Sequence, residues 1–372
     1  MIKNFDERSS GWLVIALVLG SAGFVARGEV YFGPWYWTLA LSTAVIGYKI
    51  ASRFGTILAL SFMYWVLNPI ILGQITPFSG SQHIALLSMQ SISKDSAIFA
   101  LLFTLLAISC RDRVVRFKHA FCFLWIIEAI SLLLPRDILG LDGFLGNTTI
   151  GCCFLVLTAC MLPEYYRTPW GVVRARLSVM FVTTLFIPFF HSATAFAALV
   201  PMWLGCYWFR LRGDARRFMI APPLLCLSLL PLVKPNVFLG RDRYELWSLA
   251  IEDFWQGANH WFGYGHGTYK YLGPQIQITN NYWGPFGKEV YLWLHNDWLQ
   301  IFFEGGYIGF ALSLLLYFDL LRIFYCRRLG SYCAATLIFG FIMCTQYPLE
   351  LPVFALFGFF LIIKAYSVKQ VN

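Results

Sequence analysis

Charged side chains are scarce in this 372-residue chain, in which aspartate, glutamate, lysine and arginine together make up 13% of the residues. A soluble domain of average composition contains about 25% of them. The sequence also lacks any stretch long and polar enough for a separate soluble domain, because apolar runs recur along its whole length. These two absences predict a polytopic membrane protein that has the lipid bilayer as its solvent.

The sequence lacks a cluster of histidines, cysteines and acids at metal-ligand spacing, so we expect neither a metal nor another cofactor. Its 10 cysteines lie in or beside apolar runs, and none lies in the longest polar stretch. We therefore expect small buried hydrophobic residues rather than a disulfide framework or a redox centre. The first apolar run is preceded by mixed charges and lacks a small-residue cleavage site, so we expect a retained transmembrane helix.

The apolar runs predict an all-α fold, a polytopic transmembrane helix bundle of about twelve spans. Several runs are short for a bilayer core of about 30 Å, so tilted helices or longer ends are expected. We treat residues 1–372 as a single integral membrane domain. The expected spans are residues 11–26, 30–48, 54–73, 97–110, 117–135, 148–163, 177–190, 193–209, 218–233, 297–321, 333–347 and 351–363.

The lysines and arginines, which give the chain a net charge of +9, gather in every second connection between these runs. Such a distribution is typical of topology signals and does not indicate a nucleic-acid surface. With the basic connections inside, both termini are cytoplasmic. The long loop of residues 234–296 then faces the exterior, which is the periplasm in a Gram-negative bacterium.

An amphipathic helix is predicted from about Arg243 onward, because Asp242 and Glu245 form a capping-box pattern before apolar residues at helical spacing. Arg241 and Arg243 stand at its start, where the helix dipole and free amides favour an anion. A guanidinium there suits a phosphate group. The alternative is that these arginines contact lipid headgroups.

Three glycines, Gly263, Gly265 and Gly267, alternate with aromatic residues and a histidine in the segment HWFGYGHGTY. Glycines this dense predict tight turns or a close approach of two backbones. A phosphate-binding loop is possible, but the strand and helix of a nucleotide fingerprint are absent. The many aromatic residues nearby suit either a membrane-interface belt or the stacking of sugars.

Polar residues stand where the chain re-enters an apolar run, in the segment LHNDWLQIFFEGG. His295 could take a proton from a sugar hydroxyl. Glu304 lies about two turns deeper, and a carboxylate in a membrane segment indicates a functional site. On a regular helix His295 and Glu304 would point in roughly opposite directions, so we do not expect a pair unless Gly305 and Gly306 distort the helix. Glu304 is then expected to face the interior and hold a partner in place.

The chain resembles the O-antigen ligase and polymerase superfamily of bacterial envelopes. Arg243 to Trp247 looks like its R-x-x-x-W motif, and Gly263 to Gly265 looks like its G-x-G motif. His295 and Asn296, followed by Leu299, Glu304, Gly306 and Gly309, look like its H-N-x-x-L…E-x-G-x-x-G run. The three motifs stand in the order and on the side of the membrane that the resemblance requires.

The resemblance implies a metal-independent glycosyltransferase of the bacterial inner membrane, acting in lipopolysaccharide biosynthesis. Its donor would be a glycan on undecaprenyl pyrophosphate. Arg243 matches the position that holds the pyrophosphate, and His295 matches the histidine proposed to activate the acceptor. Arg241, Trp247, Gly263, Gly265, Asn296 and Glu304 are the further residues expected to bind substrate.

One departure from the family concerns a second arginine near the outer end of the span that starts around Ser192. This chain has no arginine between Arg176 and Arg210. A second cation must then come from another residue, or the diphosphate is held differently. The candidates are Arg241, Lys234, Lys270, Lys288 and Arg136.

The leading hypothesis is an O-antigen ligase, which transfers the glycan to lipid A-core. A polysaccharide polymerase uses the same donor with a second lipid-linked glycan as acceptor, and the residues do not discriminate between the two. A transporter or flippase would need charged residues along a pathway through the spans. Apart from Glu128, Glu304 and Asp319 the expected spans are nearly uncharged, which favours an enzyme that works on one side of the membrane.

Overall fold

The computed structural model of the chain describes residues 48, 51–52, 55–75, 125–133, 148–160, 169–190, 192–208, 241–257, 259–282 and 290–370. Helices account for most of these residues, and no strand occurs among them. The predicted all-α fold is therefore confirmed for the described part of the chain.

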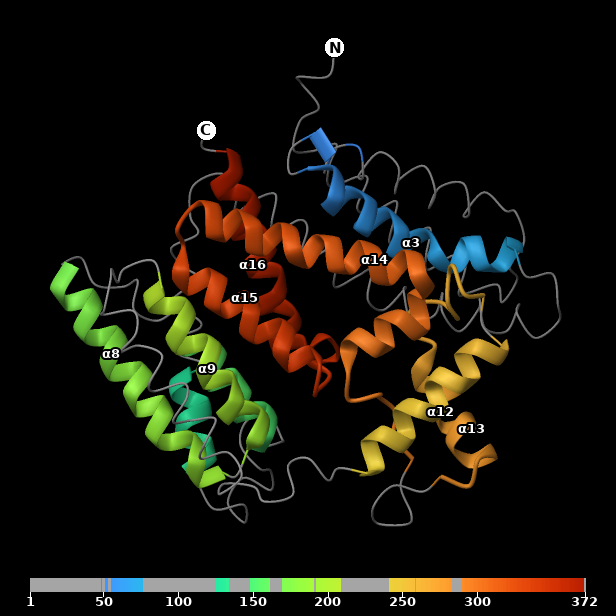
Figure 1. The fold of residues 1–372 in the computed structure, drawn as a ribbon, viewed down its shortest axis with the longest axis horizontal. Coiled ribbons are helices and arrows are strands. Elements are labelled where there is room, and N and C mark those ends of the chain that lie inside the picture. Colours follow the sequence, from blue (N-terminus) through green and yellow to red (C-terminus); the bar gives the residue numbers. More distant parts are fainter. Residues whose placement is uncertain are drawn as a thin grey trace. The chain divides into compact units, whose positions relative to one another are not determined.

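The helices of the described residues run in the following chain order, and Figure 1 labels most of them. They are α3 (Thr56–Ile75), α7 (Thr148–Ala159), α8 (Pro169–Phe186), the 3-10 helix η2 (Ile187–Phe190), α9 (Ala193–Trp208), α12 (Arg241–Gly257), α13 (Tyr269–Thr279), α14 (Asp297–Cys326), α15 (Gly330–Met343), the 3-10 helix η3 (Pro348–Glu350) and α16 (Pro352–Gln370).

Most of the expected spans with described residues coincide with one of these helices. They are spans 54–73, 148–163, 177–190, 193–209, 297–321, 333–347 and 351–363. Span 117–135 is helical over residues 125–133. Spans 11–26, 97–110 and 218–233, and span 30–48 except its last residue, lie outside the described residues.

One helix in the described part of the chain, α14, is long and apolar enough to cross a membrane by length and composition. The other apolar helical stretches of that part are 10–17 residues long. The helices thus stand where the spans were expected, whereas the number of membrane crossings stays a prediction.

The chain divides into two compact units. The first unit comprises Met1–Arg111, Arg241–Asp319 and Lys369–Asn372, and the second comprises Asp112–Gly240 and Leu320–Val368. The described part of the predicted loop 234–296 belongs to the first unit. Residues 234–240, 258 and 283–289 of that loop lie outside the described residues.

In the second unit α9 lies along α15, and α7 packs against both (Figure 1). Residues 150–159 of α7 are all buried. Gly205 of α9 faces Ala334 of α15 so closely that a Cβ on Gly205 would lie 2.5 Å from the Ala334 Cβ. Small side chains therefore set the distance between these two helices, as is common in membrane bundles.

The described cysteines follow the expectation only in part. Those that are buried, as predicted, are Cys152, Cys153, Cys160 and Cys333. Cys326 and Cys344 are exposed, which corrects the prediction of a buried role for these two. Both stand at or just after a helix end, where packing on every side is harder to achieve.

Candidate functional site

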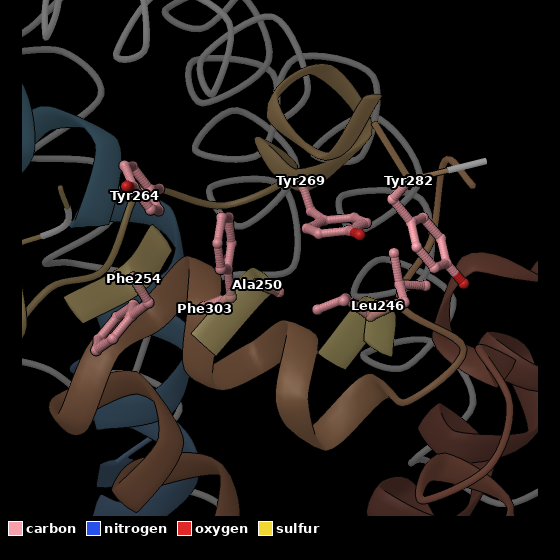
Figure 2. Close-up of a cluster of buried hydrophobic side chains, with 8 residues drawn as sticks. Leu246, Ala250, Phe254, Tyr264, Tyr269, Tyr282 and Phe303 are labelled. Atoms are coloured by element: carbon pink, nitrogen blue, oxygen red, sulfur yellow. The ribbon is translucent and has the colours of Figure 1, made fainter. Parts of the chain in front are cut away.

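A buried aromatic cluster joins α12, α13 and α14 in the first unit (Figure 2). Leu246, Ala250 and Phe254 recur every fourth residue of α12, so they form one face of this helix. This face meets the ring of Phe303 from α14, which also packs against Tyr264 at a centroid distance of 4.7 Å. The predicted amphipathic helix is confirmed. It begins at Arg241, so Asp242 lies in its first turn rather than at the predicted cap.

The helix α14 is broken at Gly306, which has φ 58° and ψ −161°. An unbroken helix would bond the Tyr307 N–H to the Phe303 carbonyl and the Ile308 N–H to the Glu304 carbonyl. The break separates these donors from these acceptors inside the protein, where unpaired backbone groups are costly.

The segment of residues 259–269, hereafter the glycine loop, supplies the missing partners. The amides of Tyr264 and Gly265 donate to the carbonyls of Phe303 and Glu304 at 3.1 and 2.8 Å. In the other direction, Tyr307 and Ile308 donate to the carbonyls of His260 and Trp261 at 2.9 and 3.1 Å. The glycine loop therefore fills the gap between the two halves of α14.

The glycines of this loop are required by its backbone. Gly263, Gly265 and Gly267 have φ values of 71°, 107° and 70°, which side chains other than glycine's rarely allow. A Cβ on Gly263 would also collide with the Glu304 carbonyl, and a Cβ on Gly306 with the Gly263 nitrogen. The prediction of tight turns and a close backbone approach is thus confirmed.

The amides of the same three glycines already donate within the protein. Gly263 donates to the Asn259 carbonyl at 2.6 Å, and Gly265 donates to the Glu304 carbonyl. Gly267 donates to the Glu304 carboxylate at 2.8 Å. A phosphate group could bind these amides only if those hydrogen bonds broke. Substrate binding by Gly263 and Gly265 therefore stays a prediction, and the observed hydrogen bonds do not support it.

Glu304 is buried and anchors the glycine loop to α14. Its carboxylate accepts the N–H groups of Gly267 and Tyr269, at 2.8 and 3.1 Å, and the Gln300 side-chain amide at 3.3 Å. Tyr269 is the first residue of α13, so the carboxylate also faces the positive end of that helix. The prediction that Glu304 is an interior residue holding a partner in place is confirmed.

The helix α3 also holds the glycine loop, through hydrogen bonds from two of its side chains. The Asn68 side chain donates to the Phe262 carbonyl at 2.7 Å and accepts from the His266 amide at 3.2 Å. The Tyr64 hydroxyl donates to the Gly305 carbonyl beside the helix break. Tyr64 and Asn68 were not predicted as site residues, because their sequence neighbourhood carries no motif. His266 lies within the predicted glycine-rich segment, but it was not named as a site residue.

Tyr264 ties the glycine loop to α12 as well. Its hydroxyl donates to the Asp253 carboxylate at 2.7 Å. Burial, and then the Asp253 carboxylate, raise the pKa of Tyr264, so the phenol stays protonated and can donate at neutral pH. The glycine loop is thereby held by α3, α12 and α14 together.

A second set of predicted residues meets at the start of α14. Trp247 lies one turn after Arg243 on α12, and its indole N–H donates to the Leu294 carbonyl at 2.7 Å. This bond ties α12 to the residue before His295. Arg243 consequently lies near enough for its charge to act on His295. The R-x-x-x-W and H-N motifs, which are far apart in the sequence, are brought together.

Burial and then the Arg243 guanidinium lower the pKa of His295 to about 4. The imidazole is therefore neutral at neutral pH and able to accept a proton. The backbone of His295 has φ 53°, an unusual value for a residue other than glycine or asparagine. Such strain is characteristic of functional sites, where the surroundings hold a residue in one geometry.

Asn296 caps α14, because its side-chain oxygen accepts the Leu299 N–H at 3.0 Å. This hydrogen bond stabilises the start of the helix. It does not test the predicted contact of Asn296 with substrate, which stays a prediction. The helix is distorted at Gly306, as the sequence analysis allowed. His295 and Glu304 both lie before Gly306 in the chain, so the distortion does not change their positions relative to each other.

Of the other candidate cations, Arg241 is the first residue of α12. The Lys270 ammonium lies over the ring of Tyr271, 5.4 Å from its centroid. Lys234, Lys288 and Arg136 lie outside the described residues.

Comparison of the sequence with protein-family models and with curated proteins found no match. The family resemblance therefore rests on the sequence motifs.

Proposed function

We propose that the chain is a glycosyltransferase of the O-antigen ligase type, embedded in a bacterial inner membrane with its working face in the periplasm. It would transfer a glycan from undecaprenyl pyrophosphate to lipid A-core. In this proposal the apolar helices are membrane spans, and the polar loop of residues 234–296, which contains α12 and α13, forms the outer surface of the site.

The juxtaposition of Arg243 and His295 carries the proposal. A glycosyl transfer from a diphosphate needs a cation where the leaving group departs and a base where the acceptor attacks. Arg243 lies in the first turn of α12, where the helix dipole adds to its own positive charge. His295 is neutral and therefore in the form that can accept a proton.

The proposed step replaces one carbon–oxygen bond with another and moves one proton. The acceptor hydroxyl oxygen attacks the anomeric carbon of the donor sugar, and its proton passes to the His295 imidazole. The bond between that carbon and the pyrophosphate oxygen breaks, and undecaprenyl pyrophosphate leaves with the electron pair. Arg243 stabilises the negative charge that develops on the leaving oxygen, an effect typically of about 3 kcal/mol per donor.

The electrostatics of the pair also predict an order of binding. A histidine whose pKa is about 4 is a weak base. A bound pyrophosphate would offset the charge of Arg243, one of the two causes that lower this pKa, and would raise the basicity of His295. The base would thus become effective when the donor is in place.

The test uses a strain that lacks the gene, complemented with His295→Asn or Arg243→Gln, with membrane expression checked and envelope glycans resolved by gel. Asparagine tolerates the positive φ of His295, so this variant removes the base with little added backbone strain. We expect each variant to lose transfer by about 100-fold or more. The control Arg322→Gln changes an exposed arginine at the other end of α14 and should restore the glycan.

The strain without the gene identifies the acceptor. Lipid-linked polymer accumulates if the protein is a ligase, whereas lipid A-core capped with a single repeat indicates the polymerase. Full complementation by both His295→Asn and Arg243→Gln would rule out the proposed chemistry and favour a transporter.

A further inference from the structure

We infer that Gln277 of α13 is a positioning residue that fixes His295 through the backbone and ring of Tyr291. The role of this geometry in transfer rests on the proposed function. Gln277 is fully buried, whereas the exposed surface of α13 carries Ile278 and Thr279. No sequence motif contains Gln277, and the argument for its role comes from its contacts alone.

The side-chain amide of Gln277 pairs with both backbone groups of one residue. Its nitrogen donates to the Tyr291 carbonyl at 2.7 Å, and its oxygen accepts the Tyr291 N–H at 2.8 Å. The nitrogen donates in addition to the Gly273 carbonyl, one turn earlier in α13, at 3.0 Å. Gln277 thus holds Tyr291 in the way that a neighbouring β-strand would, and its own rotamer is fixed by Gly273.

Tyr291 passes this constraint to His295. The two rings meet edge to face, with their centroids 5.2 Å apart and their planes at 90°. One residue before His295, the Trp247 indole donates to the carbonyl of Leu294. The short segment that carries the histidine is therefore bonded to α13 at one point and to α12 at another, which accounts for how its strained backbone is maintained.

The bonding pattern explains why a glutamine is needed. Pairing with both the N–H and the carbonyl of Tyr291 requires one donor and one acceptor at the end of the same side chain. Methionine would fill the same volume with neither. An ionised glutamate would offer acceptors alone, and its second oxygen would face the Tyr291 and Gly273 carbonyls. Protonated glutamate regains a donor.

The experiment compares wild type, Gln277→Met and Gln277→Glu as full-length protein in phospholipid nanodiscs. The first readout is the rate at which diethyl pyrocarbonate modifies His295, followed by mass spectrometry, with His260 of the same molecule as internal reference. In Gln277→Met we expect His295 to react faster than in wild type and His260 to react at an unchanged rate. This readout does not depend on any enzyme activity.

The second readout is transfer from a lipid-linked glycan donor. We expect kcat of Gln277→Met to fall about 10- to 100-fold, because a displaced catalytic group loses its alignment, with the donor KM nearly unchanged. Gln277→Glu should be impaired at neutral pH and recover relative to wild type as the pH is lowered. Thr158→Val removes a buried side-chain bond in the second unit and should leave both readouts unchanged.

The outcomes separate this inference from the proposed function. Unchanged His295 reactivity in both Gln277 variants overturns the positioning role, whatever happens to kcat. Should Gln277→Met fail to fold, Gln277→Glu compared at acidic and neutral pH decides the matter within one protein. If Gln277→Met alters His295 reactivity while His295→Asn still transfers glycan, the positioning role holds and the proposed function fails.

Discussion

The two units of the chain join their segments in different ways. In the second unit α9 and α15 approach each other through small side chains, with Gly205 against Ala334. In the first unit the glycine loop joins α14 through four hydrogen bonds between backbone groups, at a place where the helix is broken. One junction depends on side-chain volume and the other on backbone conformation.

This difference indicates why the candidate site lies in the first unit. Packed helix faces position side chains on regular helices, which leaves little freedom to expose or strain a particular group. The broken helix and the glycine loop instead create an irregular surface, and backbone hydrogen bonds between the two segments stabilise it. Polar groups can then be held inside the protein, as the Glu304 carboxylate is held by the N–H groups of Gly267 and Tyr269.

The largest effect is expected from Gly306→Ala, which breaks the backbone junction. The new Cβ would collide with the Gly263 nitrogen at a residue with φ 58°. We expect a loss of about 3 kcal/mol or more in the free energy of unfolding. Hydrogen exchange should rise at residues 259–269, and the thermal transition in detergent should fall.

Gly358→Ala in α16 is the matched control in the second unit. A Cβ on Gly358 would lie 3.2 Å from the Phe339 ring, a contact that small side-chain shifts can relieve. We expect a change below about 1 kcal/mol. Equal losses in the two variants would show that a Cβ at the helix break costs no more than a Cβ against a side chain that can shift.

The next effect compares one buried carboxylate from each unit, Glu304 from the first and Glu128 from the second. In Glu304→Gln the new amide nitrogen would face an N–H donor, either that of Gly267 or that of Tyr269. We expect a loss of about 2–4 kcal/mol, measured by chemical unfolding in mixed micelles.

Glu128→Gln tests the same change in the second unit. Its carboxylate accepts from the Ser131 hydroxyl at 3.4 Å, and glutamine keeps an acceptor for this bond. Removing a buried charge while keeping its volume costs less than about 1 kcal/mol or even stabilises. A larger loss for Glu128→Gln than for Glu304→Gln would contradict the comparison.

A smaller effect is expected from pH, through His295. Its pKa falls from 6.5 in the unfolded chain to about 4 in the folded protein. Between these values the unfolded chain binds a proton that the folded protein does not, so stability decreases as the pH falls from about 6.5 to about 4. The part lost should be roughly 1–3 kcal/mol.

Subtracting the pH profile of His295→Asn isolates this contribution, because the carboxylates titrate in both proteins. The difference should vanish above about pH 7. Parallel profiles for wild type and His295→Asn would argue against the lowered pKa.

The smallest effect compares single side-chain hydroxyls. Tyr264→Phe loses a bond from the glycine loop to the Asp253 carboxylate, and we expect a loss of about 1–2 kcal/mol. Thr336→Val in α15 loses a bond to the Tyr332 carbonyl of its own helix, and we expect a change within about 0.5 kcal/mol. Thermal unfolding of both variants measures the difference.

The sequence was sufficient to predict the helices that carry long apolar runs. The spans expected at residues 193–209 and 297–321 correspond to α9 and α14, because burial and apolar length dominate those segments. The helix α13 was not located in advance. It contains Gly273 and Pro274 and has no side-chain cap, so its propensity is weak and its contacts with Glu304 and Tyr291 support it.

The candidate site was predictable where a local pattern was enough. Glycine density indicated a close backbone approach, and the isolated acid at position 304 indicated a buried anchor. The partners of these residues could not be inferred, because Asn68 lies 198 positions before His266 and meets it through one hydrogen bond, from the His266 backbone N–H to the Asn68 side-chain oxygen. A local sequence pattern carries no information on contacts between residues so far apart.

The backbone junction at Gly306 has a consequence for how such a protein can diverge. Its four hydrogen bonds involve no side chain, so they do not require the indole of Trp261, which is 63% exposed and packs edge to face on the Tyr307 ring. Descendants of this chain could replace the outward-facing residues of the glycine loop and keep the same architecture. The backbone junction would thus stay the same while the residues on the surface that contacts a partner change.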